Sequence, residues 1–277
     1  MHEEDLFYIE KSTNTQQALD LILPLNLSPG YHPPILIFVH GGAWRTGDKS
    51  EFLAFGKELS QKANVAVALV NYRLSTEATP EIKHPNHIED VAAAVFWVYQ
   101  HSKKYNYRRD RIYLVGHSAG AFLASQLVFM PEYLDRYNPS VRDQIRGVVG
   151  IEGIYDLVDL VETWPSYIDF VSGAFGLNET IYKTASPQHC TPTVNIPPYL
   201  IIHSRNDELV HLAHSEKFVS HVQKFTLVCD FDTSLTGTHD GILGTNSLVD
   251  RIADFVIMLE SKELDHCRIS NKVVDEI

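Results

Sequence analysis

The sequence predicts an α/β fold, with a mostly parallel central sheet covered by helices on both faces. Short apolar runs rich in β-branched residues are typical of strands buried on both faces, and they occupy 34–41, 64–72, 111–118, 146–153, 197–204 and 225–231. Patterns with helical periodicity lie between them, at 51–63, 86–102, 119–129, 211–223 and 246–260. Because strands that alternate with helices form parallel sheets, this order predicts one sheet between two layers of helices.

The length and composition favour a single domain. A chain of 277 residues with 44% apolar content can bury one sizeable core. We expect this domain at 1–262, with a C-terminal tail at 263–277 and an antiparallel sheet edge formed by the first 25 residues. Residues 131–190 break the alternation and carry several aromatics, which predicts a helical insertion. Because parallel sheets gather function at the carboxyl ends of strands, such an insertion would cap a pocket.

Charge and cysteine usage limit the partners and the compartment. The 23 basic and 35 acidic residues give a formal charge of −12, which disfavours binding to nucleic acid or to an anionic membrane surface. The cysteines Cys190, Cys229 and Cys267 form no CxxC pair, which is typical of reduced thiols in a reducing compartment. The acidic N-terminus is unlike a signal peptide, and no apolar run approaches the roughly 20 residues of a membrane span. We expect a cytoplasmic protein, and the sequence predicts no particular oligomeric state.

Gly116-His117-Ser118-Ala119-Gly120 directly follows the predicted strand RIYLV and opens the helical pattern AGAFLASQLVF. This context is typical of a nucleophile elbow, in which the glycines let a strand turn sharply into a helix. The serine then stands at the helix N-terminus, where the dipole favours developing negative charge. Ser118 is therefore the candidate nucleophile, and the alternative is an ordinary glycine-rich turn.

A serine hydroxyl is a weak nucleophile, so it needs a base and an acid that orients the base; in this kind of fold they follow in the order serine, acid, histidine. Asp207 follows a predicted strand in HSRNDE, with Glu208 as the neighbouring alternative, and His239 lies in the loop before the last helix. The alternative is that Asp207 is an ordinary turn residue or a helix cap with no catalytic role. The other histidines after Asp207 fall on a predicted helix or in the tail: His211, His214, His221 and His266.

His40-Gly41-Gly42-Ala43-Trp44 follows the strand PILIFV and is the candidate oxyanion loop. Glycines permit the backbone to approach a substrate closely. The N–H groups of Gly41, Gly42 and Ala43 would join that of Ala119, and removing one such donor typically costs ~2.7 to 4 kcal/mol of transition-state stabilisation. The alternative is a plain tight turn. We expect no cofactor and no metal, because no HExxH or paired ligand spacing occurs.

Together, HGGAW (40–44), NYRLS (71–75), GHSAG (116–120), HSRND (203–207) and THDG (238–241) resemble the α/β-hydrolase superfamily. The likeness covers residues 34–260 and is nearest to the esterase branch that contains kynurenine formamidases, prenylcysteine methylesterases and lipase-like carboxylesterases. HGGxW is the kynurenine formamidase pattern, whereas HGGG typifies the esterases that resemble hormone-sensitive lipase. GIEGIYDL (150–157) is similar to the SGIYDL segment of the formamidases and methylesterases, with Glu152 in place of a small residue.

The resemblance implies an α/β-hydrolase fold with a helical cap and a serine hydrolase that works through an acyl-enzyme. Its implied substrate is a small acyl compound, first of all N-formyl-L-kynurenine, which gives L-kynurenine and formate. The alternatives are a carboxylesterase acting on short acyl esters and a non-catalytic binder of a small ligand, the latter disfavoured because all three triad positions are filled.

The cap aromatics and two further residues are candidates for the substrate pocket. Trp44 and Glu152 lie in the segments that resemble the formamidases, and we expect them to contact substrate together with Trp164. Glu152 would pair with a substrate ammonium, the alternative being a buried carboxylate bonded to the backbone of the cap. The other candidate aromatics are Tyr167, Phe170 and Phe175.

Overall fold

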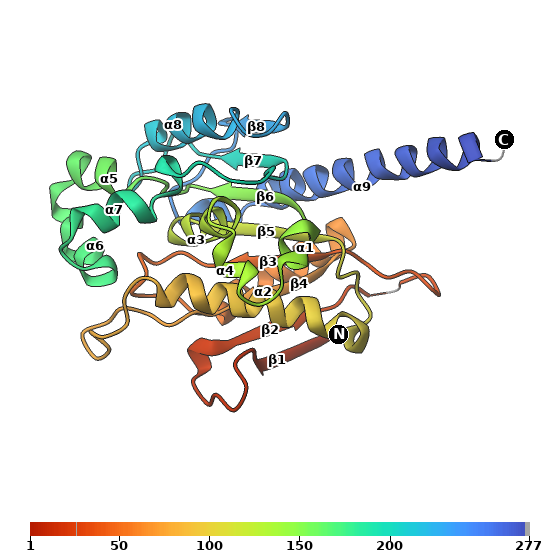
Figure 1. The fold of residues 1–277 in the computed structure, drawn as a ribbon, viewed down its shortest axis with the longest axis horizontal. Helices are drawn as coiled ribbons and strands as arrows, with labels where there is room; N and C mark the ends of the chain where they lie inside the picture. Colours follow the sequence, from red (N-terminus) through yellow and green to blue (C-terminus); the bar gives the residue numbers. More distant parts are fainter. Residues whose placement is uncertain (26, 275–277) are drawn as a thin grey trace.

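The computed structural model describes residues 1–25 and 27–274, with side chains up to residue 261. Within them, eight strands form one sheet in the order β1-β2-β4-β3-β5-β6-β7-β8 (Figure 1). The strands are β1 (His2–Phe7), β2 (Ala18–Ile22), β3 (Ile35–Val39), β4 (Ala66–Val70), β5 (Ile112–His117), β6 (Ile145–Ile151), β7 (Tyr199–Ile202) and β8 (Cys229–Asp232). Strands β3 to β8 are parallel, whereas β1 and β2 pair antiparallel at one edge, so the predicted α/β architecture is confirmed.

Helices cover both faces of the sheet (Figure 1). They are α1 (Leu53–Ala63), α2 (Asn86–Tyr105), α3 (Ala119–Phe129), α4 (Glu132–Asp135), α5 (Leu157–Thr163), α6 (Ile168–Phe175), α7 (Glu179–Ala185), α8 (Leu212–Val222) and α9 (Asn246–Val274). Among the described helices, none combines the length and apolar character needed to cross a membrane.

Alternation along each strand divides the core into two clusters. In β3, Ile35 and Ile37 pack in the cluster that includes residues of α2, α3 and α8, whereas Leu36 and Phe38 pack in the cluster that includes residues of α1 and α9. Successive side chains of a strand point to opposite faces, so a run of five fully buried apolar residues requires a helix layer on each side.

β8 differs from the sequence prediction. The apolar run 225–231 predicts a strand buried on both faces, but β8 spans only Cys229–Asp232 and its residues are half-buried or exposed. The reason is its position, because β8 ends the sheet and pairs with β7 alone. Cys229 is consequently a partly exposed free thiol rather than a core residue.

The predicted insertion at 131–190 is divided by β6. Residues 131–144 form α4 and a short 3-10 helix ahead of that strand, whereas α5, α6 and α7 follow it and lie beyond one end of the sheet (Figure 1). The predicted tail at 263–277 begins inside α9, which continues to Val274; residues 275–277 lie outside the described residues.

Candidate active site

Every candidate segment follows a parallel strand. The loop 40–44 leaves β3, Ser118 leaves β5, Glu152 leaves β6, the acidic loop leaves β7 and the loop of His239 leaves β8. Because the carboxyl ends of parallel strands meet at one edge of a sheet, residues far apart in the sequence converge there.

Ser118 sits in a sharp turn between β5 and α3. Its backbone has φ +52° and ψ −117°, a conformation that few residues other than glycine adopt. A Cβ at Gly116 would lie 2.3 Å from the carbonyl oxygen of Gly120, and one at Gly120 would lie 2.0 Å from that of Val39. Glycine is therefore required on both sides of the serine, and the turn leaves Ser118 at the N-terminus of α3 with 5% of its surface exposed.

The loop 40–44 lies against this turn. A Cβ at Gly41 would lie 3.0 Å from the Cβ of Ser118. The hydroxyl of Tyr72 donates to the carbonyls of His40 and Gly41, and the amides of Arg45 and Thr46 donate to that of Gly42. Within the described residues, no group accepts a hydrogen bond from the N–H of Gly42 or Ala43. These donors, and that of Ala119 in the first turn of α3, are available to a ligand beside Ser118.

His239 and Asp207 are joined directly. Nδ1 of His239 lies 2.9 Å from Oδ2 of Asp207, and the histidine is only 4% exposed. Because a carboxylate only accepts, Nδ1 carries the proton of this bond and Nε2 is left to act as a base.

Asp207, rather than Glu208, meets the imidazole because the backbone holds its carboxylate in place. Oδ1 of Asp207 accepts hydrogen bonds from the amides of Leu209 (2.8 Å) and Val210 (2.9 Å). Burial raises the pKa of Asp207, but hydrogen bonds from His203 and His239 outweigh it and hold that pKa well below its usual range. Glu208 instead accepts a bond from the backbone N–H of His239, at 3.1 Å.

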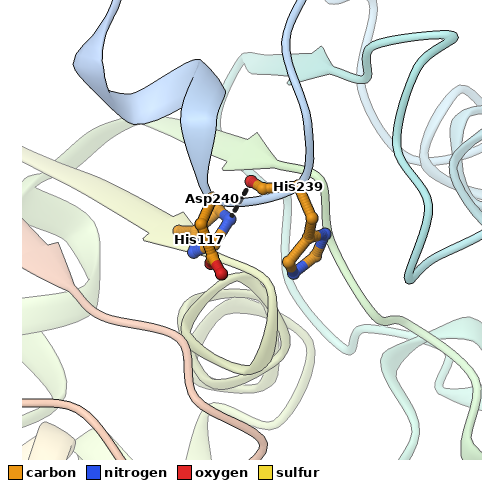
Figure 2. A group of neighbouring side chains, drawn as sticks. All are labelled: His117, His239 and Asp240. Atoms are coloured by element: carbon orange, nitrogen blue, oxygen red, sulfur yellow. Dashed lines mark hydrogen bonds between the residues drawn. The ribbon is translucent and has the colours of Figure 1, made fainter.

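His117, the second residue of the GHSAG motif, holds the loop of His239 in place. Its Nε2 donates to the carbonyl oxygen of His239 at 2.9 Å (Figure 2). Burial, followed by the neighbouring His239, lowers the pKa of His117 to about 3, so the ring is neutral and keeps this tautomer at neutral pH. Sequence reasoning did not assign this role to His117, although its position within the elbow motif was a signal.

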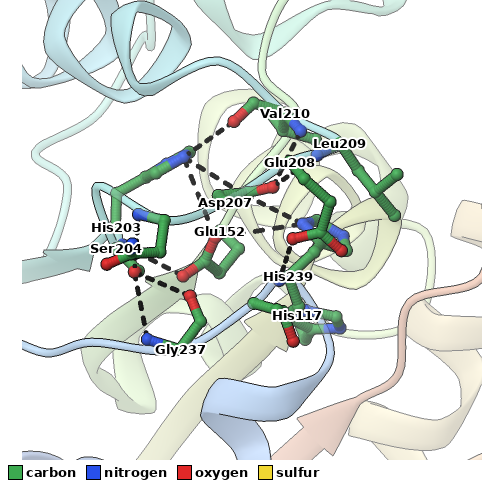
Figure 3. Close-up of polar contacts among 12 residues, drawn as sticks. His117, Glu152, His203, Ser204, Asp207, Glu208, Leu209, Val210, Gly237 and His239 are labelled. Carbon is green, nitrogen blue, oxygen red and sulfur yellow. Dashed lines mark hydrogen bonds and ion pairs between the residues drawn. The ribbon is translucent and has the colours of Figure 1, made fainter.

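A second histidine missed by sequence reasoning stands on the other side of Asp207. His203 lies four residues before Asp207 at the end of β7 and is fully buried. Its Nε2 donates to the carbonyl of Val210 at 3.0 Å and lies 3.2 Å from Oδ2 of Asp207 (Figure 3). Its Nδ1 contacts the hydroxyl of Ser215 at 2.8 Å. The spacing HSRND was the available signal, because both residues leave the same strand.

Two groups of side chains have the composition of metal ligands, with ligand atoms within 4.8 Å of one another: His117, His239 and Asp240, and Glu152, His203 and Asp207. In the first, Nε2 of His117 is engaged by a carbonyl. In the second, both ring nitrogens of His203 are engaged by Ser215 and Val210. In each set, histidine nitrogens that would bind a metal already serve protein hydrogen bonds, which disfavours a metal centre at either place.

A cavity of about 350 Å³ opens beside Ser118 and His239. Cap residues and the loop before α8 supply apolar and aromatic surface, and Arg45 stands in the wall as a cation. The lining comprises Gly42, Ala43, Arg45, Thr46, Ser118, Ile154, Tyr167, Phe170, Leu209, Val210, His239 and Asp240. The candidate nucleophile and base thus share one cavity with Gly42 and Ala43, whereas Gly41 and Ala119 are not among its lining residues.

Three predicted pocket residues do not line this cavity, which corrects the sequence prediction. Trp44 is fully buried and packs edge-on against Phe122 and Phe175, so it anchors the candidate oxyanion loop to the core. Glu152 is also fully buried, which removes it from contact with a substrate ammonium. Trp164 stacks on Tyr167, and among the other candidate aromatics Tyr167 and Phe170 reach the cavity, whereas Phe175 is buried in the core.

Comparison with known proteins identifies the family. The BD-FAE family model matches residues 19–222. The chain is 30% identical to a kynurenine formamidase of Meyerozyma guilliermondii, over 80% of this chain and 83% of the relative. It is 28% identical to the probable carboxylic ester hydrolase LipM of Mycobacterium tuberculosis, over 69% of this chain and 45% of the relative.

Solved structures of esterases share the fold. The crystal structure of esterase B from Lactobacillus rhamnosis superposes with a TM-score of 0.79 at 19% identity, covering 97% of this chain and 88% of that one. The family match, the relatives and the mostly parallel sheet agree. The chain therefore belongs to the BD-FAE family and is an enzyme of the α/β-hydrolase fold, related to kynurenine formamidases and to carboxylic ester hydrolases.

Proposed function

We propose that the protein hydrolyses a small acyl group through an acyl-enzyme, with Ser118 as nucleophile, His239 as general base and Asp207 as the acid that orients it. The observation that carries this proposal is the 2.9 Å bond between His239 and Asp207, made at the cavity that both Ser118 and His239 line. Five loops from five parallel strands converge on that cavity, which is the usual site of function in open α/β sheets.

The proposed reaction has two half-reactions. Oγ of Ser118 forms a bond to the carbonyl carbon while its proton passes to Nε2 of His239, and Asp207 stabilises the imidazolium. The amides of Gly42, Ala43 and Ala119, with Gly41 beside them, bind the oxyanion. The bond to the leaving amine or alcohol then breaks as His239 returns the proton to that group, and water releases the acid by the same steps.

We propose an N-formyl aryl amine as substrate, namely N-formyl-L-kynurenine. The rings of Tyr167 and Phe170 line the cavity beside the nucleophile, so an aryl group can stack there while a formyl carbon reaches Ser118. The relative named kynurenine formamidase, similar over most of both chains, supports this choice.

An ion pair between Arg45, which lines the cavity, and the neighbouring Asp169 fits the amino-acid end of that substrate. Nη1 of Arg45 lies 2.8 Å from Oδ2 of Asp169, and both side chains are about half exposed or more. Exposed pairs of this kind contribute only about 0 to 1 kcal/mol, so a zwitterion can replace the contact, its carboxylate meeting Arg45 and its ammonium meeting Asp169. Arg45 also lies over the ring of Phe170, 5.4 Å from its centroid, which places the cation next to the proposed aryl position.

The proposed substrate is tested by comparing purified enzyme on N-formyl-L-kynurenine and on p-nitrophenyl acetate and butyrate. We expect kcat/KM to be higher for the formamide. If it turns over no faster than the esters, the carboxylesterase alternative, supported by the relative named a carboxylic ester hydrolase, replaces the formamidase.

Replacing Arg45 with methionine tests how the amino-acid end is bound. We expect KM for N-formyl-L-kynurenine to rise roughly tenfold, because a charge-assisted hydrogen bond contributes about 1.5 kcal/mol or more. Formanilide, which has no carboxylate, should show no such change. The matched control is Arg205→Met, an exposed arginine that contacts Thr233 outside the cavity. Equal changes with both substrates would exclude carboxylate recognition by Arg45.

We further propose that the enzyme acts in the cytoplasm. Cys190 and Cys229 are free thiols, as expected in a reducing compartment. Imaging of the tagged full chain tests this, and a secreted or organellar signal would contradict it.

A further inference from the structure

Glu152 is fully buried at the edge where β5, β6 and β7 end, beside the proposed triad. The strand register pairs His117 with Ile151 and Ile151 with Ile202, so the next residues along these strands, Ser118, Glu152 and His203, stand side by side. Glu152 also has φ +50°, which few residues other than glycine adopt. Residues held in such conformations cluster at functional sites.

The two carboxyl oxygens of Glu152 have different surroundings. Oε1 accepts a hydrogen bond from the backbone N–H of Ser204 at 3.0 Å. Oε2 is buried and accepts no hydrogen bond from the described residues. It lies 3.8 Å from Nε2 of His203 and 3.9 Å from Nδ1 of His239, the two nitrogens that face Asp207 (Figure 3). An unpaired buried carboxylate oxygen carries a large energetic cost unless it is protonated.

We propose that Glu152 carries a proton on Oε2 and donates it in a hydrogen bond to Asp207, and so acts as a positioning residue for the acid of the proposed triad. This inference rests on the proposed function, because it assigns Glu152 a part in holding Asp207 against His239.

The donor count decides which of the two carboxyl groups keeps the proton. Asp207 faces four N–H groups, from Leu209, Val210, His203 and His239. Glu152 faces one, from Ser204. Two neighbouring buried carboxylates cannot both be ionised at low cost, and the proton stays on the group whose charge is less well stabilised.

The charged surroundings agree with this assignment. The titratable groups that face Glu152 are Asp207, Glu208 and His203 from the loop after β7, His239 from the loop after β8, and Tyr155 from its own segment. Burial, followed by the hydrogen bond with Asp207, raises the pKa of Glu152 to about 10.

A protonated Glu152 has two consequences for catalysis. It adds a donor to the Asp207 carboxylate, which restricts rotation of that group. It also keeps the charge of the carboxyl pair at one unit, which matches the single positive charge that His239 acquires in the transition state. Both effects require the proton and not the negative charge of a glutamate.

Two variants separate the proton from the charge. Glu152→Gln keeps a hydrogen-bond donor in a side chain of the same shape. We expect its kcat to stay within about fivefold of that of wild type, a change no larger than the loss of one ordinary hydrogen bond would cause. Glu152→Met keeps the length without a donor, and we expect kcat to fall roughly 10²-fold with KM little changed, as for a displaced catalytic group. A Gln variant as impaired as the Met variant, with both folded by circular dichroism, would overturn the proposal, as would an unimpaired Met variant.

Stability against pH tests the same proton without any substrate. The pKa of Glu152 is raised from 4.5 to about 10, so its protonated form contributes stability that is complete below pH 4.5 and lost as pH rises toward 10. Glutamine does not titrate, so the melting temperature of Glu152→Gln should gain on that of wild type between about pH 6 and 9. The control Glu216→Gln, on the exposed surface of α8, should show no such trend.

If the melting temperature of Glu152→Gln stayed constant or fell relative to that of wild type between about pH 6 and 9, Glu152 would be ionised and the inference would be overturned. The infrared band of a buried protonated carboxyl, present in wild type at neutral pH and absent in Glu152→Gln, gives a readout that holds even if Glu152→Met fails to fold. None of these stability or spectroscopic results depends on the proposed substrate, so the two proposals can fail separately.

Discussion

Replacing Ser118 with alanine should lower kcat roughly 10⁶-fold, because removal of a serine nucleophile disables the whole triad at once. The acyl-enzyme needs the Ser118 oxygen, and the neighbouring groups supply only binding and the oxyanion site. The measurement is steady-state hydrolysis of the better substrate, with labelling by a fluorophosphonate probe read by mass spectrometry. Wild type should be labelled on Ser118, and the variant should remain unlabelled.

The control for this change is Ser125→Ala. Ser125 lies on the same helix α3 and is fully buried, but it does not line the cavity. Its loss should leave the rate and the labelling close to those of wild type. If Ser118→Ala retained substantial activity, the nucleophile would be another group. If wild type failed to react with the probe or with any acyl substrate, the non-catalytic binder would be favoured.

Replacing Asp207 with asparagine should lower kcat about 10⁴-fold at nearly constant KM, as expected when the acid of a triad is neutralised. Oδ2 of Asp207 fixes the proton of His239 on Nδ1, and an amide at this position favours the wrong tautomer. It also leaves the donors of His203 and Glu152 without their ionised acceptor, so a lower melting temperature should accompany the loss of rate.

Glu208→Gln is the matched control for Asp207→Asn. Within the described residues, the Glu208 carboxylate accepts a hydrogen bond from the backbone N–H of His239 through Oε2, so its conversion to an amide should lower kcat less than about tenfold. Comparing kcat of the two variants at equal folded fraction separates the candidate acids. A greater loss in Glu208→Gln than in Asp207→Asn would exchange their proposed roles.

The doubly covered parallel strands and the elbow follow from local patterns. β3 and β4 are continuous apolar runs and β5 begins with one, and only a sheet covered on both faces can accommodate them. At Ser118 the sequence requirement is steric, since a side chain at position 116 or 120 would meet backbone atoms at 2.3 Å or less. Such constraints act within a few residues and can therefore be predicted from the chain alone.

The sequence prediction names Asp207 as the acid with Glu208 as its neighbouring alternative, but short-range steric limits do not separate the two. Asp207 and Glu208 lie in the same loop and carry the same kind of charge. Which of them meets the imidazole of His239 depends on the two amides that bind Asp207 and on where the loop of His239 lies. The latter depends in turn on His117, whose bond spans 122 positions of the sequence.

The residues that line the pocket could not be predicted from local sequence either. The composition of the HGGAW loop indicates an aromatic beside the oxyanion site, yet Ala43 and Trp44 both have positive φ, and Trp44 is buried against Phe122 and Phe175. The aromatic wall comes instead from Tyr167 and Phe170, and the cation from Arg45.

By itself the sequence determined the fold class, the position of the candidate nucleophile and the order of the triad candidates, because these depend on periodicity and on short-range steric limits. The tertiary structure alone decided which side chains meet. Glu152 is the clearest case: in the sequence it is an acid in a segment that resembles one of the formamidases and methylesterases, and it is predicted to contact substrate. In the fold, strand register buries it beside Asp207. Two neighbouring buried carboxylates cannot both be ionised at low cost, which favours a proton on Glu152.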